Sequence, residues 1–123
     1  MSIVQRHVVS VTTDGAGAAT SYSPVVTGRL LAIHYVKTDF TDGVDFTITA
    51  EATGESLWTG TNVNASVAVY PRGPQHDLVG AARLYAAAGQ AVADLIGLAN
   101  DRVKIVIAAG GATKTGAFHI VLG

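Results

Sequence analysis

Residues 98–123 read LANDRVKIVIAAGGATKTGAFHIVLG, and this stretch decides the fold class. Two runs rich in β-branched residues lie on either side of Gly110-Gly111. Apolar residues occupy every second position of both runs: Val103, Ile105 and Ile107, then Phe118, Ile120 and Leu122. A period of two is typical of a half-buried strand. The stretch therefore predicts a hairpin that closes a sheet and turns at the two glycines.

The rest of the chain repeats this pattern of short β-rich segments separated by turns. Residues 14–17 and Asp42-Gly43 are turn signals, and the second is a strong hairpin signal. Many short strands with frequent glycine turns are typical of a β-sandwich or barrel. We expect a single all-β domain over residues 1–123, an antiparallel, jelly-roll-like β-sandwich of about seven to eight short strands. Before the closing hairpin, its strands are expected at residues 3–13, 22–26, 29–36, 44–52, 56–59 and 66–70. Pro24 restricts the segment at 22–26 to an edge or irregular position.

Two segments carry more specific expectations. Residues 29–36 are apolar on both faces of a strand, which predicts a central strand that is covered on both sides. Residues 78–99 are rich in alanine, which favours a helix, but glycines interrupt them. We therefore expect one short helix or a loop near residues 78–88. An extended segment over residues 91–98 then leads into the closing hairpin.

Composition excludes several classes of function. Charged residues make up 14% of the chain, and the formal net charge is −1. The cations are scattered, so we expect no nucleic-acid partner. The absence of cysteine excludes disulfides and thiolate chemistry. No apolar run has the length of a signal-peptide core or a membrane span, so we expect synthesis in a host cytoplasm and no membrane partner.

The low charge also indicates how the surface is used. Alanine, threonine, glycine and valine dominate the chain, and interface centres are depleted in charge. Such a composition favours a protein that buries much of its outside against neighbours. The alternative is a monomer with a surface of small residues.

No group of residues has the spacing of a catalytic site. His34 and His119 fall within predicted strands and could meet on one sheet face, but a metal site needs a third ligand. A paired, partly buried set of histidines is the interpretation we favour. Asp39, Asp42 and Asp45 indicate a turn, with bound calcium as the alternative. We expect no enzyme activity, no catalytic residues, no cofactor and no metal.

Several segments together resemble small structural proteins of tailed bacteriophages. They are GRLLAIHYV at 28–36, GVDFTITA at 43–50, TNVNA at 61–65, YPR at 70–72, LANDRVKI at 98–105 and the return KTGAFH at 114–119. The resemblance covers residues 25–123 and rests on strands and turns rather than on a catalytic signature. It implies a β-rich virion protein without a cofactor or catalytic residues.

The resemblance and the composition lead to one expected function. We expect a virion structural protein, most specifically a capsid decoration or minor capsid protein of the phage head. Its partners would be the major capsid protein, whose lattice it stabilises, and copies of itself in a closed homo-oligomer such as a trimer. One alternative is a module of the tail, neck or fibres. Another is a carbohydrate-binding β-sandwich for host attachment, with Trp58, Tyr70 and Tyr85 as its sugar platform.

Two segments are candidates for the interface. The first is the N-terminal strand with Ile3, Val4 and Arg6, because terminal strands readily add to the sheet edge of a neighbour. The alternative is that this strand pairs within its own domain. The second candidate is the loop over residues 71–78, which is long enough to reach outward with Arg72, His76 and Asp77.

Overall fold

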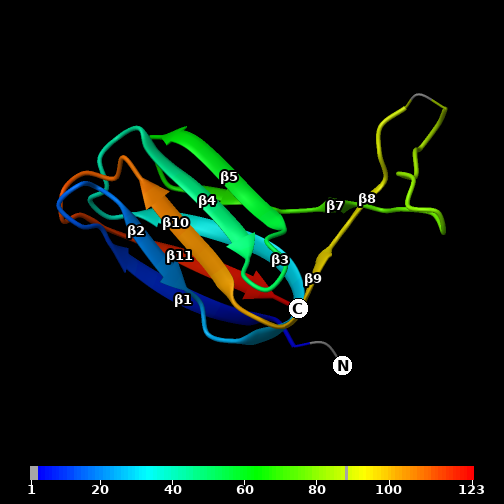
Figure 1. Ribbon diagram of the computed structural model, residues 1–123, viewed down its shortest axis with the longest axis horizontal. Coiled ribbons are helices and arrows are strands. Elements are labelled where there is room, and N and C mark those ends of the chain that lie inside the picture. The colour runs from blue at the N-terminus through cyan, green and yellow to red at the C-terminus, as the bar shows by residue number, and fades with distance from the viewer. Residues whose placement is uncertain (1–2, 88) are drawn as a thin grey trace.

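The computed structural model describes residues 3–87 and 89–123, and the described chain consists of strands and their connections. Two antiparallel sheets pack face to face, as Figure 1 shows. Sheet A contains β1 (Gln5–Thr12), β11 (Thr115–Leu122), β3 (Val26–Lys37), β6 (Val67–Val69) and β9 (Ile96–Asp101). Sheet B contains β2 (Ala19–Tyr22), β10 (Val103–Ala108), β4 (Val44–Ala50) and β5 (Ser56–Val63).

The strand order confirms the predicted jelly-roll-like sandwich. Sheet A runs β1-β11-β3-β6, and sheet B runs β2-β10-β4-β5. The first strand therefore lies beside the last, the second beside the penultimate one, and the chain crosses repeatedly between the sheets. This nesting of early and late strands is the jelly-roll arrangement.

Strands β6 and β9 occupy successive parts of one edge position along β3. Val69 pairs with Ile33 and Ile96 pairs with Leu30, so β9 continues along β3 where β6 ends. The chain between them leaves the sheet and forms a projecting arm, which we define as residues 71–95 (Figure 1). The arm is thus an insertion within one edge position of the jelly roll.

Alternation along the strands builds a single core between the sheets. In β4, β10 and β11, buried and partly buried residues follow one another with the predicted period of two. The centre is a cluster of aromatic rings. The Tyr35 ring centroid lies 4.6 Å from that of Phe46 and 5.3 Å from that of Phe118. Phe40 completes the cluster with a centroid 6.2 Å from Tyr35.

The predicted closing hairpin is wrong. Strand β10 pairs with β2 and β4 in sheet B, whereas β11 pairs with β1 and β3 in sheet A. The Gly110-Gly111 segment therefore crosses between the sheets, held by Thr13, whose hydroxyl donates to the Gly111 carbonyl at 2.6 Å. Asp42-Gly43 likewise joins β3 to β4 in the other sheet. Alternation specifies which side of a strand faces the core, and it does not specify the neighbouring strand.

Two further predictions differ from the structure. The strand expected over residues 22–26 is instead β2, which ends at Tyr22, because Pro24 cannot donate to a sheet. The helix expected near residues 78–88 is absent from residues 78–87, and Ala88 lies outside the described residues. A turn replaces it, in which the Asp77 Oδ1 atom accepts hydrogen bonds from the backbone N–H groups of Val79 and Ala81. The alternative prediction of a loop there is confirmed.

Candidate interaction surface

The outward side of sheet A is partly exposed and carries little charge. We call it face A. Its members alternate with the core residues of β1, β11, β3 and β6: Arg6, Val8, Ser10, Ala32, His34, Val36, Ala68, Ala117, His119 and Val121. Val8 is 53% exposed and Val36 is 41% exposed. Valine and alanine account for six of these ten residues, Arg6 is the one permanently charged residue among the ten, and none of them is a carboxylate.

The outward side of sheet B has a different chemistry. We call it face B. Its members are Thr20, Tyr22, Asp45, Thr47, Thr49, Thr59, Lys104 and Val106. Threonine hydroxyls and charges of both signs suit contact with water. Antiparallel sandwiches commonly solvate their outer faces in this way, so face A is the unusual one of the two.

Two histidines lie at the centre of face A. His119 pairs directly with His34 across β11 and β3, which confirms that they meet on one sheet face. Val8 is the neighbour of His119 on the other side, in β1. The ring of Tyr70 packs edge-on against His34, with centroids 6.5 Å apart. Among residues 3–87 and 89–123, no group of three His, Asp or Glu side chains could hold a metal ion.

The arm is the second uncovered surface. Its stem is a pair of short strands, β7 (Gly73–Pro74) and β8 (Ala93–Asp94). Beyond the stem the chain forms two successive turns. A β-bridge between His76 and Ala82 closes the first, and a β-bridge between Leu84 and Ala91 closes the second. The arm extends away from the sandwich along the long axis of the molecule (Figure 1).

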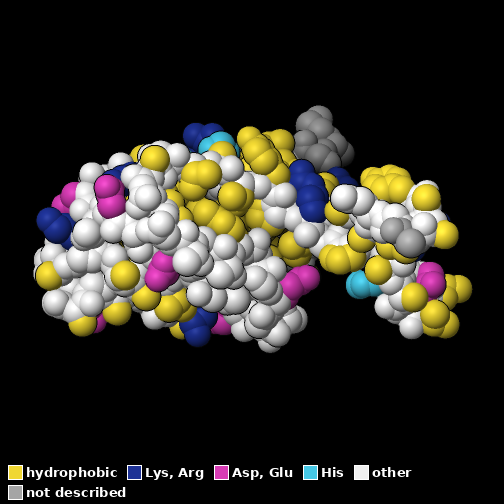
Figure 2. Space-filling model, turned by 90° about the horizontal axis from the view of Figure 1, so that it is seen from above, with side chains coloured by type: hydrophobic (Ala, Val, Ile, Leu, Met, Phe, Trp, Pro, Cys, Tyr) yellow, Lys and Arg dark blue, Asp and Glu magenta, His cyan; other side chains and the backbone are white. Residues whose placement is uncertain are grey.

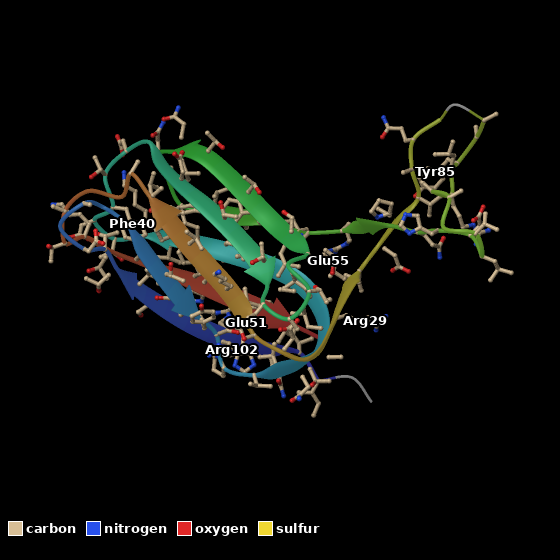
Figure 3. The ribbon with its side chains drawn as sticks, in the orientation of Figure 1. Arg29, Phe40, Glu51, Glu55, Tyr85 and Arg102 are labelled. Atoms are coloured by element: carbon tan, nitrogen blue, oxygen red, sulfur yellow. The ribbon has the colours of Figure 1, made fainter. Side chains whose placement is uncertain are left out.

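The arm has hydrogen bonds but no core. Each described residue from 76 to 91 is exposed. Leu78 is fully exposed, Val79 is 88% exposed and Tyr85 is 76% exposed. Figure 2 shows how much of the arm surface is hydrophobic, and Figure 3 shows Tyr85 on the arm, far from Phe40 at the opposite end of the sandwich. Clustered exposed apolar side chains are a common feature of interaction sites, which makes the arm a candidate for one.

The interface candidates from the sequence divide between these surfaces. Arg6 lies on face A beside Val121, in a strand that pairs with β11 of its own domain. Ile3 and Val4 precede that strand and are 68% and 65% exposed. These three residues thus lie at the β1 edge of sheet A.

The other three candidates belong to the arm. Arg72 fixes the root of the arm, because its Nη1 atom donates to the Leu31 carbonyl at 3.1 Å and to the Pro71 carbonyl at 2.8 Å. His76 and Asp77 lie beyond the stem and are exposed. The structure therefore does not bring the six candidates together in one site.

Sequence reasoning did not single out three exposed hydrophobic residues of these surfaces. They are Val8 and Val36 on face A and Val79 on the arm. The sequence did contain one indication of face A. The segment at residues 29–36 is apolar on both sides, which predicts a strand that is covered on both of its faces. The core covers β3 on its inner side, and its outer side belongs to face A.

Charged and aromatic side chains elsewhere have local partners. Arg102 forms an ion pair with Glu51 and stacks over the Tyr22 ring, 4.2 Å from its centroid (Figure 3). The Glu51 carboxylate raises the pKa of Arg102. The Trp58 ring packs against the core residue Phe46, with centroids 5.5 Å apart.

The three aspartates of the predicted turn bond to different groups. Asp39 accepts a hydrogen bond from the backbone N–H of Thr115, and Asp45 accepts one from Asn62. Asp42 pairs with Lys37. Each carboxylate therefore fixes a separate part of this end of the sandwich.

Comparison with known proteins identifies no relative. No protein family, curated protein or solved structure matches this chain. Among the described residues, no helix has the length and hydropathy needed to cross a membrane.

Proposed function

We propose that the protein is a structural component of a virion, a capsid decoration or minor capsid protein that self-associates through face A. The observation that carries the proposal is the contrast between the two outer faces. Face A is apolar and nearly uncharged, whereas face B is rich in threonine and carries Asp45 and Lys104. Burying an apolar surface such as face A against a neighbouring molecule removes it from water and therefore lowers the free energy.

Two other considerations support a virion. The resemblance of residues 25–123 to small phage structural proteins is one. The jelly roll is the other, because viral capsid and lectin domains share this architecture. A fold alone does not fix a function, so the assignment depends on how face A and the arm are used.

Self-association would strengthen the binding of such a protein to a capsid shell. A closed ring presents the same capsid-binding surface several times, and repeated weak contacts add up to strong binding through effective concentration. Bridging several capsid subunits at once stabilises the lattice. The partners are therefore copies of this chain and the major capsid protein, and the location is the phage head.

The test uses particles of the phage that encodes the chain. Quantitative mass spectrometry of purified particles should find the chain at a copy number of the order of the capsid subunits. A few copies per particle would place it in the tail, neck or fibres and contradict the decoration role. Purified protein added to shells that lack it should co-sediment with them.

A matched pair of variants sharpens this binding test. Val36→Glu places a charge on face A, and Thr47→Glu places one on face B, both on central strands. The first variant should lose co-sedimentation because the ring dissociates and its avidity is lost. The second should bind as the parent protein does, and equal loss in both variants would contradict the role of face A.

A further inference from the structure

The arm cannot be covered by its own sandwich. Near its start, Arg72 donates a hydrogen bond to the Leu31 carbonyl, and the arm extends beyond the end of the sheets (Figure 1). Its hydrogen bonds define its shape: the backbone N–H of Gln75 donates to the Val92 carbonyl at 2.7 Å, and that of Arg83 donates to Gln75 at 2.8 Å. The exposed apolar turns of the arm have no core of their own, so burying them requires a surface on another molecule.

Face A provides a surface of matching chemistry. Its valines and alanines offer apolar contact, and its polar centre consists of His34 and His119 with Arg6 at the edge. The turn formed by Asp77–Ala81 places Leu78 and Val79 directly beside a carboxylate. The turn is therefore apolar and acidic, whereas the residues of face A include exposed valines and the cation Arg6 and no carboxylate.

We propose that the Asp77–Ala81 turn of one copy seats on face A of a second copy. The inference rests on the proposed self-association and names the two surfaces that meet. This contact buries Leu78 and Val79 of one copy against the exposed valines of face A on the next. The contact is head to tail, so its repetition forms a ring when the rotation between successive copies closes, as the proposed closed oligomer requires. It also explains why β3 is apolar on the side that its own core does not cover.

Cysteine cross-linking tests this contact directly, because the chain contains no cysteine of its own. Leu78→Cys marks the turn, Val8→Cys marks face A and Thr47→Cys marks face B. The single variants are mixed in pairs under mild oxidation, and the products are separated by mass. Leu78→Cys mixed with Val8→Cys should give the mixed disulfide dimer at a yield many times that of Leu78→Cys mixed with Thr47→Cys.

Three outcomes would overturn the proposal. The first is that Leu78→Cys forms disulfide dimers with itself in preference to Val8→Cys, which would mean contact between two arms. The second is equal cross-linking of Leu78→Cys to Val8→Cys and to Thr47→Cys. The third is a wild-type protein that is monomeric at all concentrations. Cross-linking as expected, together with absence from virions, would contradict only the proposed virion function. Binding to shells by a protein without arm-to-face cross-links would contradict only this inference.

Discussion

At the scale of single residues, Tyr35 shows how tightly the aromatic cluster is built. Its side chain is 1% exposed and packs against the rings of Phe46, Phe118 and Phe40. Within the described part of the chain, its hydroxyl has no hydrogen-bond partner. A buried hydroxyl without a partner costs free energy that the unfolded chain does not lose. The ring therefore stabilises the fold and the hydroxyl opposes it.

Replacing Tyr35 with phenylalanine should consequently stabilise the protein. The ring contacts stay, and the unpaired hydroxyl is removed, so the free energy of unfolding should rise by about 1 kcal/mol. Urea titration followed by fluorescence measures this change. As a control, Tyr85→Phe on the exposed arm should leave the unfolding free energy unaltered. A decrease in the Tyr35→Phe variant would show that the hydroxyl makes a stabilising contact.

The same residue predicts a dependence of stability on pH. Burial, with a smaller effect from the Asp42 carboxylate, raises the pKa of Tyr35 from 10.0 to about 12. Between these values the unfolded chain loses the phenolic proton and the folded chain keeps it, so stability falls as pH rises. The wild type should lose more stability than Tyr35→Phe over this range. Parallel curves for the two proteins in thermal melts would refute this.

At the scale of elements, the arm and the sandwich are energetically separate. No described side chain between residues 76 and 91 is buried, and the stem already joins Gln75 to Val92 by a backbone hydrogen bond. Exposed insertions of this kind tolerate deletion well. We therefore expect the arm to contribute little to the stability of the sheets.

Replacing residues 76–91 with an Asn-Gly turn tests this separation. The two-residue turn suits a hairpin between Gln75 and Val92. The shortened protein should keep the thermal midpoint of the parent within a few degrees, which circular dichroism measures, because the core is unchanged. It should also lose self-association. Cooperative unfolding at a much lower temperature would mean that the arm supports the core.

The elements also show how far sequence reasoning extends. The residues of β4 and β10 that face the core follow from their alternation, because a pleated strand turns successive side chains to opposite sides. The turn at Gly54 joins two strands of one sheet, whereas that at Gly43 joins two sheets. Both glycines have positive φ, so local turn chemistry does not tell them apart. Strand neighbours depend on how the whole chain packs.

The interaction surface was harder to predict for a related reason. Alanine in residues 78–87 suggested a helix, but Asp77 bonds to the backbone of the following turn and competes with helix formation. The outer row of Val8, His119 and His34 comes from three strands far apart in sequence. Only the register of the sheet places these residues side by side.

At the scale of the whole molecule, one sandwich presents two unlike faces. Face B resembles the solvated side of an ordinary antiparallel sheet. The residues that define face A include a single permanently charged side chain, Arg6, and a low charge is typical of interface centres. This asymmetry is the basis for proposing assembly through face A.

Sedimentation velocity is the measurement that tests this account most directly. The wild type, Val36→Glu and Thr47→Glu are compared at the same concentrations, with circular dichroism to verify folding. The wild type and Thr47→Glu should sediment as one closed oligomer, and Val36→Glu should sediment as a folded monomer. A Val36→Glu protein that keeps the oligomer, or a wild type that is monomeric throughout, would contradict the claim that face A is the assembly surface.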